Sequence, residues 1–243
     1  MLACLAVSIY YRDDDIPAFL ITITVTLLAA IGLKYKGYGA ENSLGRREAY
    51  LLVTLIWLIF SALGALPFVI SGYLTSYTDA FFETMSGFTT TGATIIDDVE
   101  ALPHGLLFWR SLTHWIGGLG IMFFTIAILP SLVGGSVKVF SAEATGPIKS
   151  KMHPRLSTTA KWIWGIYLLI TASCAACFWL FGMGFFDSIN YSMSIAATGG
   201  FSTHNASMAF FDSAAIDYTA AIFMILSGVN FSLLYLLILK GKV

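Results

Sequence analysis

Charged residues are the scarcest feature of this 243-residue sequence. Only 11% of its residues are Asp, Glu, Lys or Arg, whereas 57% are hydrophobic, and the mean hydropathy is +0.80. A soluble domain carries roughly 25% charged residues, because its surface has to be hydrated. Lipid imposes the opposite constraint, since a charged side chain in a hydrocarbon core is costly. The shortage of charge excludes an ordinary soluble domain and predicts an integral membrane protein.

Cysteine is scarce as well. The three cysteines, Cys4, Cys174 and Cys177, all lie in apolar stretches. An odd number argues against a framework of disulfides. Cys174 and Cys177 form a CxxC pair, which in another setting indicates redox chemistry or half of a zinc site. No His or Cys stands nearby at metal-ligand spacing, so we interpret these cysteines as small residues packed between helices.

Long apolar runs are abundant. A helix that crosses a hydrocarbon core of about 30 Å needs roughly 17–25 apolar residues. Five runs meet this requirement: residues 16–33, 49–71, 106–132, 161–181 and 214–239. Residues 1–11 form a shorter run, which we interpret as the tail of a spanning helix. The runs at 79–91 and 187–198 are too short to span, and they predict re-entrant helices.

The basic residues are distributed unevenly along this pattern. If each long run crosses once and each short run dips in and returns, all 13 Lys and Arg except Arg12 and Arg110 fall on one side. Most Asp and Glu residues fall on the other side. Because Lys and Arg mark cytoplasmic loops, we expect the re-entrant helices to enter from the outer face.

The chain also contains an internal repeat. A shift of 108 residues aligns Asp79 with Asp187 and Gly92 with Gly200. Each copy reads as a long helix, a short dipping helix, a Gly/Thr-rich turn and a second long helix. We therefore expect an all-α membrane protein of tandem helix–pore-loop–helix units. The expected divisions are an N-terminal transmembrane helix pair (1–47, its first helix incomplete), a first unit with its cytoplasmic loop (48–158) and a second unit (159–243).

The two Gly/Thr-rich turns, residues 89–94 and 197–203, predict an ion path. Carbonyls in such a turn have no helical partners, which is tolerated at membrane depth only where they face protein or a water-filled path. Carbonyl oxygens can replace the hydration shell of a cation, and the C-terminus of the preceding helix adds partial negative charge. Close helix packing is the alternative role for a glycine-rich turn. Two such turns on the same side favour the ion path.

At these residues the sequence resembles a known family. DAFFETMSGFTTTGAT (79–94), FWRSLTHWIGGLGIMFFTIAILP (108–130), AATGGFSTHNASMAFFDS (196–213) and residues 225–230 resemble the Trk/Ktr/HKT potassium transporters. Within that family the sequence resembles the membrane subunit of bacterial Trk-type uptake systems. In that family four units surround one pore, and this chain holds two of them. We therefore expect part of a longer transporter; the alternative is a two-unit protein that pairs to complete the ring.

The resemblance also implies a site, an ion and partners. The transported ion would be K⁺, with no organic cofactor and no nucleic acid involved. The chain would sit in a bacterial inner membrane, form a homodimer and bind a cytoplasmic nucleotide-binding regulatory subunit. The implied filter residues are the carbonyls of Thr90, Thr91, Thr198 and Gly199, with Gly92 and Gly200 shaping the loops.

Charged residues around the first turn suggest supporting roles. Asp97 and Asp98 follow the turn, where their field would raise the local cation concentration; the alternative is an ordinary solvated loop. Glu83 lies within the first dipping helix, where an ionised group needs a partner or water. Arg110 is the only basic residue nearby, so we expect a structural pair that braces the turn. Direct ion contact by Glu83 and exposure at the interface are the alternatives.

Two other classes of function are alternatives to transport. An intramembrane enzyme such as a protease would need two polar catalytic groups on facing helices, and the long runs supply no such pair. The histidines, at positions 104, 114, 153 and 204, show no metal-ligand spacing. A membrane scaffold or non-conducting fragment is the second alternative. We expect a transporter and not an enzyme.

Overall fold

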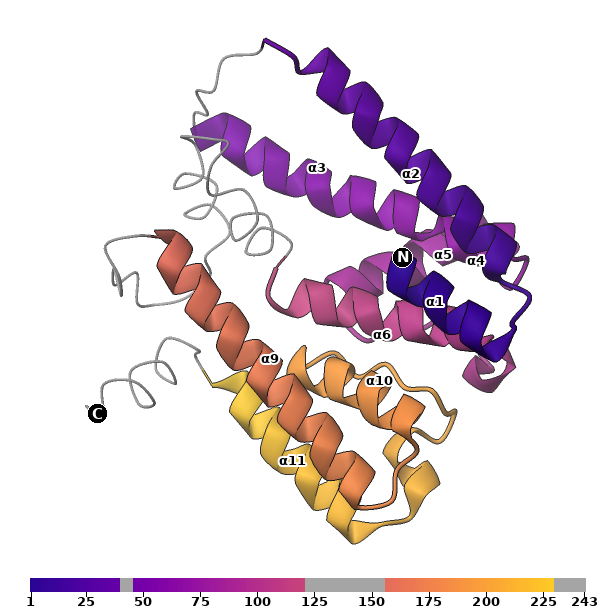
Figure 1. The fold of residues 1–243 in the computed structure, drawn as a ribbon, viewed down its shortest axis with the longest axis vertical. Helices are drawn as coiled ribbons and strands as arrows, with labels where there is room; N and C mark the ends of the chain where they lie inside the picture. The colour runs from indigo at the N-terminus through magenta and orange to yellow at the C-terminus, as the bar shows by residue number, and fades with distance from the viewer. Residues whose placement is uncertain (40–45, 121–155, 230–243) are drawn as a thin grey trace.

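The computed structural model describes residues 1–39, 46–120 and 156–229 (Figure 1). Throughout these ranges the chain forms helices and connecting loops without a strand, so the predicted all-α class is confirmed. The elements are α1 (Leu2–Tyr11), α2 (Ile16–Lys36), α3 (Arg46–Gly64), α4 (Leu66–Ile70), α5 (Tyr77–Phe88), η1 (Val99–Ala101), α6 (His104–Gly118), α9 (Leu156–Leu180), α10 (Phe185–Ala196), η2 (Ser207–Phe211) and α11 (Ala214–Gly228).

Two of these helices are long and apolar enough to cross a membrane. They are α2 and, within α9, the segment Ile163–Leu180. The prediction of unbroken helices over 106–132 and 214–239 was wrong: α6 ends at Gly118, after which Gly120 has a positive φ of 73°, and α11 ends at Gly228. The residues beyond 120 and 229 in these runs, like the basic segment from 138 to 155, lie outside the described residues.

The prediction of one continuous helix over residues 49–71 was wrong in one respect. The helix is interrupted at Ala65, so that α3 ends at Gly64 and α4 begins at Leu66. Pro67 lies in the first turn of α4, where its missing amide is harmless, whereas the interior of a longer helix would lose a hydrogen bond there. The Gly64 carbonyl instead accepts a hydrogen bond from Trp109 Nε1 at 2.9 Å.

Both predicted re-entrant segments are short helices. α5 and α10 contain 12 residues each, which corresponds to about 18 Å and falls short of a hydrocarbon core of about 30 Å. Ser76 caps α5 by accepting the Asp79 amide at 3.3 Å. Residues 79 and 187 thus both stand in the first turn of a short helix, as the shift of 108 residues requires.

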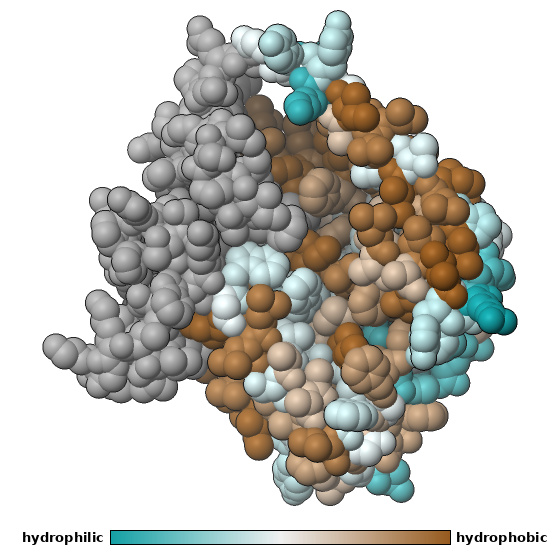
Figure 2. Space-filling view, viewed as in Figure 1, coloured by the Kyte–Doolittle hydropathy of each residue, from teal (hydrophilic) through white to brown (hydrophobic). Residues whose placement is uncertain are grey.

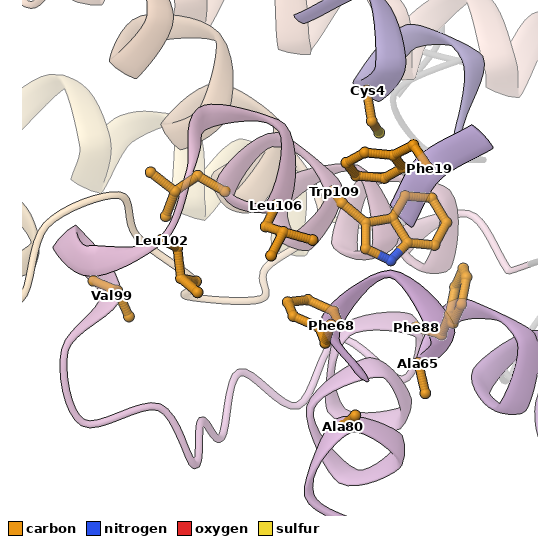
Figure 3. Close-up of a cluster of buried hydrophobic side chains, with 11 residues drawn as sticks. Cys4, Phe19, Ala65, Phe68, Ala80, Phe88, Val99, Leu102, Leu106 and Trp109 are labelled. Carbon is orange, nitrogen blue, oxygen red and sulfur yellow. The ribbon is translucent and has the colours of Figure 1, made fainter. Parts of the chain in front are cut away.

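Helix α6 joins the two parts of the fold. It packs against α5 and α1 on one side of the molecule and against α10 on the other, while α10 in turn packs on α9 and α11 (Figure 1). The first hydrophobic core surrounds Trp109 of α6, with Phe19, Phe68 and Phe88 contributed by three other helices (Figure 3). A second cluster around Tyr167 lies where the end of α6 meets α9 and α10, and a third around Phe178 lies between α9, α10 and α11.

The outer surface of the helices is strongly apolar. Leu28 and Ile31 of α2 and Ile222 and Ile225 of α11 are all more than half exposed. Brown, hydrophobic residues accordingly cover much of the visible face in Figure 2. Large exposed aliphatic side chains on long helices fit a surface in contact with lipid.

Asp15, in the turn between α1 and α2, is a buried carboxyl group. Its side chain is fully buried, and it lies so close to Gly105 that a Cβ there would overlap the Asp15 carboxylate. Burial raises the pKa of Asp15 above its ordinary value, and the negative charge of Asp13 acts in the same direction. The folded protein therefore favours the protonated form of Asp15.

The first prediction concerns this carboxyl group. Because its folded-state pKa lies above the unfolded value of about 3.9, its stabilising contribution is complete below that pH and is lost as pH rises through the folded pKa. Asp15→Asn should therefore unfold at nearly the same temperature as the parent protein at low pH and at a higher temperature at neutral pH. Thermal unfolding of the purified protein in detergent, measured from pH 4 to 7.5, tests this. Asp14→Asn, which changes an exposed neighbour, should show no such pH-dependent gain, and equal curves for both variants would contradict the assignment.

Candidate ion site

The first dipping helix ends in a Schellman motif. After α5 ends at Phe88, the Thr90 amide donates to the Gly87 carbonyl at 3.0 Å and the Thr91 amide donates to the Ser86 carbonyl at 3.0 Å. This pair of bonds satisfies the last carbonyls of a helix and reverses the direction of the chain.

The second dipping helix ends in the same way. The Thr198 amide donates to the Ile195 carbonyl at 2.9 Å, and the Gly199 amide donates to the Ser194 carbonyl at 2.9 Å. Each of these residues follows its counterpart in the first loop by 108 positions. The repeat read from the sequence is therefore also a repeat of backbone hydrogen bonding.

Both motifs place a threonine where glycine is usual. Thr90 has φ 54° and Thr198 has φ 55°, in the left-handed region. A β-branched residue there is an outlier that costs about 1–3 kcal/mol and persists only where its surroundings enforce it. Two residues further on, Gly92 and Gly200 also have positive φ, at 75° and 106°. Glycine adopts this conformation without strain.

The carbonyls of the predicted filter residues are free. Across the described parts of the chain, no donor is hydrogen-bonded to the carbonyl oxygens of Thr90, Thr91, Thr198 or Gly199. An unpaired carbonyl away from water is costly unless something else coordinates it. These four oxygens are therefore available as cation ligands.

The two loops touch each other. The backbone of Gly92 lies against the Gly199 carbonyl so closely that a Cβ at Gly92 would overlap that oxygen. A depression of about 240 Å³ opens beside this contact, lined among others by Gly92, Gly200, Asp97 and Ser202. The sequence predicts that both loops lie on one side of the membrane, and the structure brings them into contact.

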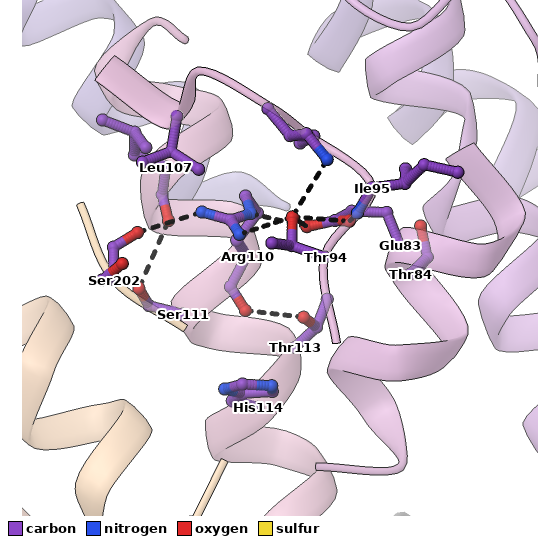
Figure 4. Close-up of polar contacts among 12 residues, drawn as sticks. Glu83, Thr84, Thr94, Ile95, Leu107, Arg110, Ser111, Thr113, His114 and Ser202 are labelled. Atoms are coloured by element: carbon purple, nitrogen blue, oxygen red, sulfur yellow. Dashed lines mark hydrogen bonds and ion pairs between the residues drawn. The ribbon is translucent and has the colours of Figure 1, made fainter. Parts of the chain in front are cut away.

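A buried ion pair braces the first loop. Arg110 Nε donates to Glu83 Oε1 at 2.8 Å, and both side chains are at most 2% exposed. The Glu83 carboxylate also accepts hydrogen bonds from Thr94 Oγ1 and from the Ile95 amide, each at 3.0 Å (Figure 4). The buried carboxylate thus accepts hydrogen bonds from Arg110, Thr94 and Ile95, and it fixes the chain just beyond Gly92.

The same arginine holds the second loop. Arg110 Nη1 donates to the Ser202 carbonyl at 3.0 Å, and its guanidinium carbon lies 4.3 Å from the centre of the Phe201 ring. Figure 4 shows Arg110 between Glu83 and Ser202. One buried pair therefore links the ends of both loops, whereas the sequence indicated support for the first loop only.

Small residues let α6 approach both loops closely. A Cβ at Gly117 would overlap the Phe88 carbonyl, and one at Gly118 would meet Ala197 at 2.7–2.8 Å. These glycines place α6 against the last residues of α5 and α10. The backbone of the two loops is consequently supported from one helix.

The two candidate outer-mouth residues have different surroundings. Asp97 lines the depression beside the loops. Asp98 instead accepts a hydrogen bond from Asn205 Nδ2 at 2.7 Å, while Asn205 Oδ1 accepts the Val99 amide at 2.8 Å. Asp98 therefore joins the segments that follow the two loops. Asn205 was missed in the sequence because no local pattern marks a contact across more than a hundred residues.

These features define a class of protein: a helical membrane protein in which two short helices each end in a Gly/Thr-rich loop. Comparison with known proteins identifies the family. The sequence profile of the TrkH family, described as cation transport proteins, matches residues 15–243, and the chain belongs to this family. The predicted resemblance is thereby confirmed, and the family is one of transporters and not of enzymes.

Individual relatives agree with this assignment. The Trk system potassium uptake protein TrkH of Salmonella typhimurium is 44% identical over 238 residues, covering 97% of this chain and 49% of the relative. TrkG of Escherichia coli is 37% identical over 245 residues, covering 100% of this chain and 50% of the relative. The crystal structure of the potassium transporter TrkH from Vibrio parahaemolyticus superposes with a TM-score of 0.82 and 40% identity, over 99% of this chain and 48% of that one. The chain spans about half the length of the curated relatives it matches.

The buried ion pair yields the second prediction. Glu83→Ala leaves the Arg110 charge buried and unpaired, which should cost about 3–5 kcal/mol and lower the unfolding midpoint by roughly 6–20 °C for a chain of this size. Combining it with Arg110→Leu should cost less than the sum of the two single changes. Thermal unfolding in detergent measures both effects. Asp97→Ala, at the exposed edge, should change stability by no more than about 0.5 kcal/mol; additive losses for the pair would disprove the coupling.

Proposed function

We propose that this chain forms part of a Trk-type path by which potassium ions cross the membrane. The ion would pass the backbone carbonyls of Thr90, Thr91, Thr198 and Gly199. The observation that carries the proposal is the pairing of the two loops, which present unpaired carbonyls where the backbone of Gly92 meets Gly199.

The electrostatics of the loops support a cation as the passenger. Both dipping helices end at the loops, so their C-terminal partial negative charges point there. Carbonyl dipoles replace water around a cation without the strong binding that a carboxylate would impose. Potassium is the ion named for the relatives described above.

Each expected unit contributes one loop to the pore. In this proposal the segments 48–158 and 159–243 supply one loop each, after the helices of 1–47. Two loops line only part of a ring, so further loops complete it, either from the same polypeptide or from a second copy. Homodimer formation and a cytoplasmic nucleotide-binding regulatory subunit follow from the family resemblance and belong to the same proposal.

The orientation is also part of the proposal. We place the loops toward the outside of a bacterial inner membrane. Lys34 and Lys36 occupy the last turn of α2, as expected for a cytoplasmic helix end, whereas Asp97 and Asp98 follow the first loop. A scaffold without transport is the competing function, and transport measurements separate the two.

Uptake in living cells provides the third prediction and tests the proposal. Cells that lack their own potassium uptake systems should grow on low potassium when they express this chain, alone or together with the C-terminal half of Vibrio parahaemolyticus TrkH. Gly92→Ser should abolish growth, because its Cβ would overlap the Gly199 carbonyl and its φ is positive. Gly72→Ser is the matched control, since Gly72 has φ +83° with open space around it. Membrane-inserted protein that supports growth in neither arrangement would overturn the proposal in favour of a scaffold.

The fourth prediction distinguishes the effect of backbone strain, which is all that Gly200→Ser introduces, from that of steric overlap, which Gly92→Ser adds. Gly200 has φ +106°, but no atom of a described residue lies within 4 Å of the position a Cβ would take. Gly200→Ser should therefore incur only the conformational cost of about 1–2 kcal/mol. Rubidium uptake should fall by roughly 5- to 30-fold and not disappear, in contrast to Gly92→Ser. Equal losses for both variants would show that the contact between Gly92 and Gly199 has no special importance.

A further inference from the structure

His114 of α6 lies directly behind the second loop. Its side chain is fully buried, and its ring stacks on Phe201 with centroids 4.0 Å apart and planes 16° apart. A Cβ at Gly199 would overlap this ring. The histidine therefore fills the space that only a glycine at position 199 leaves open.

A hydrogen-bonded chain leads from this histidine to the loop backbone. His114 Nδ1 lies 3.3 Å from Ser194 Oγ in α10. Ser194 Oγ in turn accepts the amide hydrogen of Gly200 at 3.0 Å. Two helices thus cooperate in holding one peptide group of the loop.

The peptide group that they hold contains a candidate ion ligand. The amide of Gly200 and the carbonyl of Gly199 belong to one planar trans unit, so they point in opposite directions. Fixing the amide on Ser194, behind the loop, directs the Gly199 carbonyl away from α10. This is the oxygen that lies against Gly92 of the first loop.

The first loop has no such arrangement. Ser86 is the counterpart of Ser194, 108 residues earlier, yet its buried hydroxyl makes no hydrogen bond to any described residue. That loop is held beyond its glycine by Glu83, through Thr94 and Ile95. The two loops are therefore alike in backbone and different in support.

We propose that His114 is a positioning residue that acts through Ser194 to keep the peptide group between Gly199 and Gly200 from rotating, and thereby sets selectivity among alkali cations. This inference rests on the proposed ion path. A carbonyl that can turn away leaves the ion with one ligand fewer, and the preference among ions of different size then weakens.

Hydrogen exchange tests the positioning without any transport. For the purified chain in lipid nanodiscs, Ser194→Ala and His114→Leu should each speed amide exchange at Gly200 by about fivefold, the factor that loss of one ordinary hydrogen bond produces. His114→Asn, whose side-chain amide can replace the contact at Nδ1, should retain protection. Ser86→Ala is the matched control and should leave exchange in both loops unchanged. Unaltered exchange in Ser194→Ala, or equal exchange in the Asn and Leu variants, would overturn the positioning role.

Uptake tests the consequence for selectivity. In the cells described above, His114→Leu should lower the ratio of rubidium to sodium uptake by about fivefold, whereas His114→Asn should keep it within about twofold. Faster exchange with an unchanged uptake ratio would limit His114 to structural support and overturn the selectivity role. If the parent chain takes up no potassium, the proposed function fails, and exchange alone then decides whether His114 positions the loop. If His114→Leu exchanges fast throughout α9 and has unfolded, Ser194→Ala and His114→Asn still give the answer.

Discussion

The buried pair between Glu83 and Arg110 is the contact on which the arrangement of the two loops depends. Glu83 alone would fix only the first loop, through Thr94 and the Ile95 amide. Arg110 extends the same network to the Ser202 carbonyl of the second loop. Because both charges are buried away from solvent, loss of either partner would leave the other charge unpaired, at a large cost in folding free energy. The distance between the loops is therefore set by a strong, directional interaction and not by apolar packing alone.

Helix α6 adds a second constraint of a different kind. Its glycines bring its backbone against the ends of both dipping helices, at Phe88 and Ala197. One turn beyond Arg110, His114 faces the second loop. Helix α6 thus supplies Arg110, which contacts both loops, and His114, which contacts only the second. Two loops with the same backbone hydrogen bonds consequently have unequal supports, which lets their carbonyls differ in rigidity.

Much of this fold was predictable because it follows from apolar runs, charge and repetition. The short runs at 79–91 and 187–198, which are too short to cross a membrane, correspond to the short helices α5 and α10. The break at Ala65 was missed because Pro67 lies inside an otherwise continuous apolar run. The contacts of His114 and Asn205 were missed because they join residues about 80 and 106 positions apart. One feature of the sequence did point to His114: it lies four residues after Arg110 and therefore on the same face of the helix. The division into units and the ion contacts remain predictions.

The threonines at the two helix ends show how backbone strain and hydrogen bonding can together stiffen such loops. Glycine at Thr90 and Thr198 would remove about 1–3 kcal/mol of backbone strain at each position. It would also remove a β-branched side chain and the restriction that this side chain imposes on the backbone. The hydrogen bonds of the Schellman motifs hold both threonines in place despite the strain. A strained turn whose amides are hydrogen-bonded to the preceding helix has few alternative conformations, so its unpaired carbonyls keep a fixed direction.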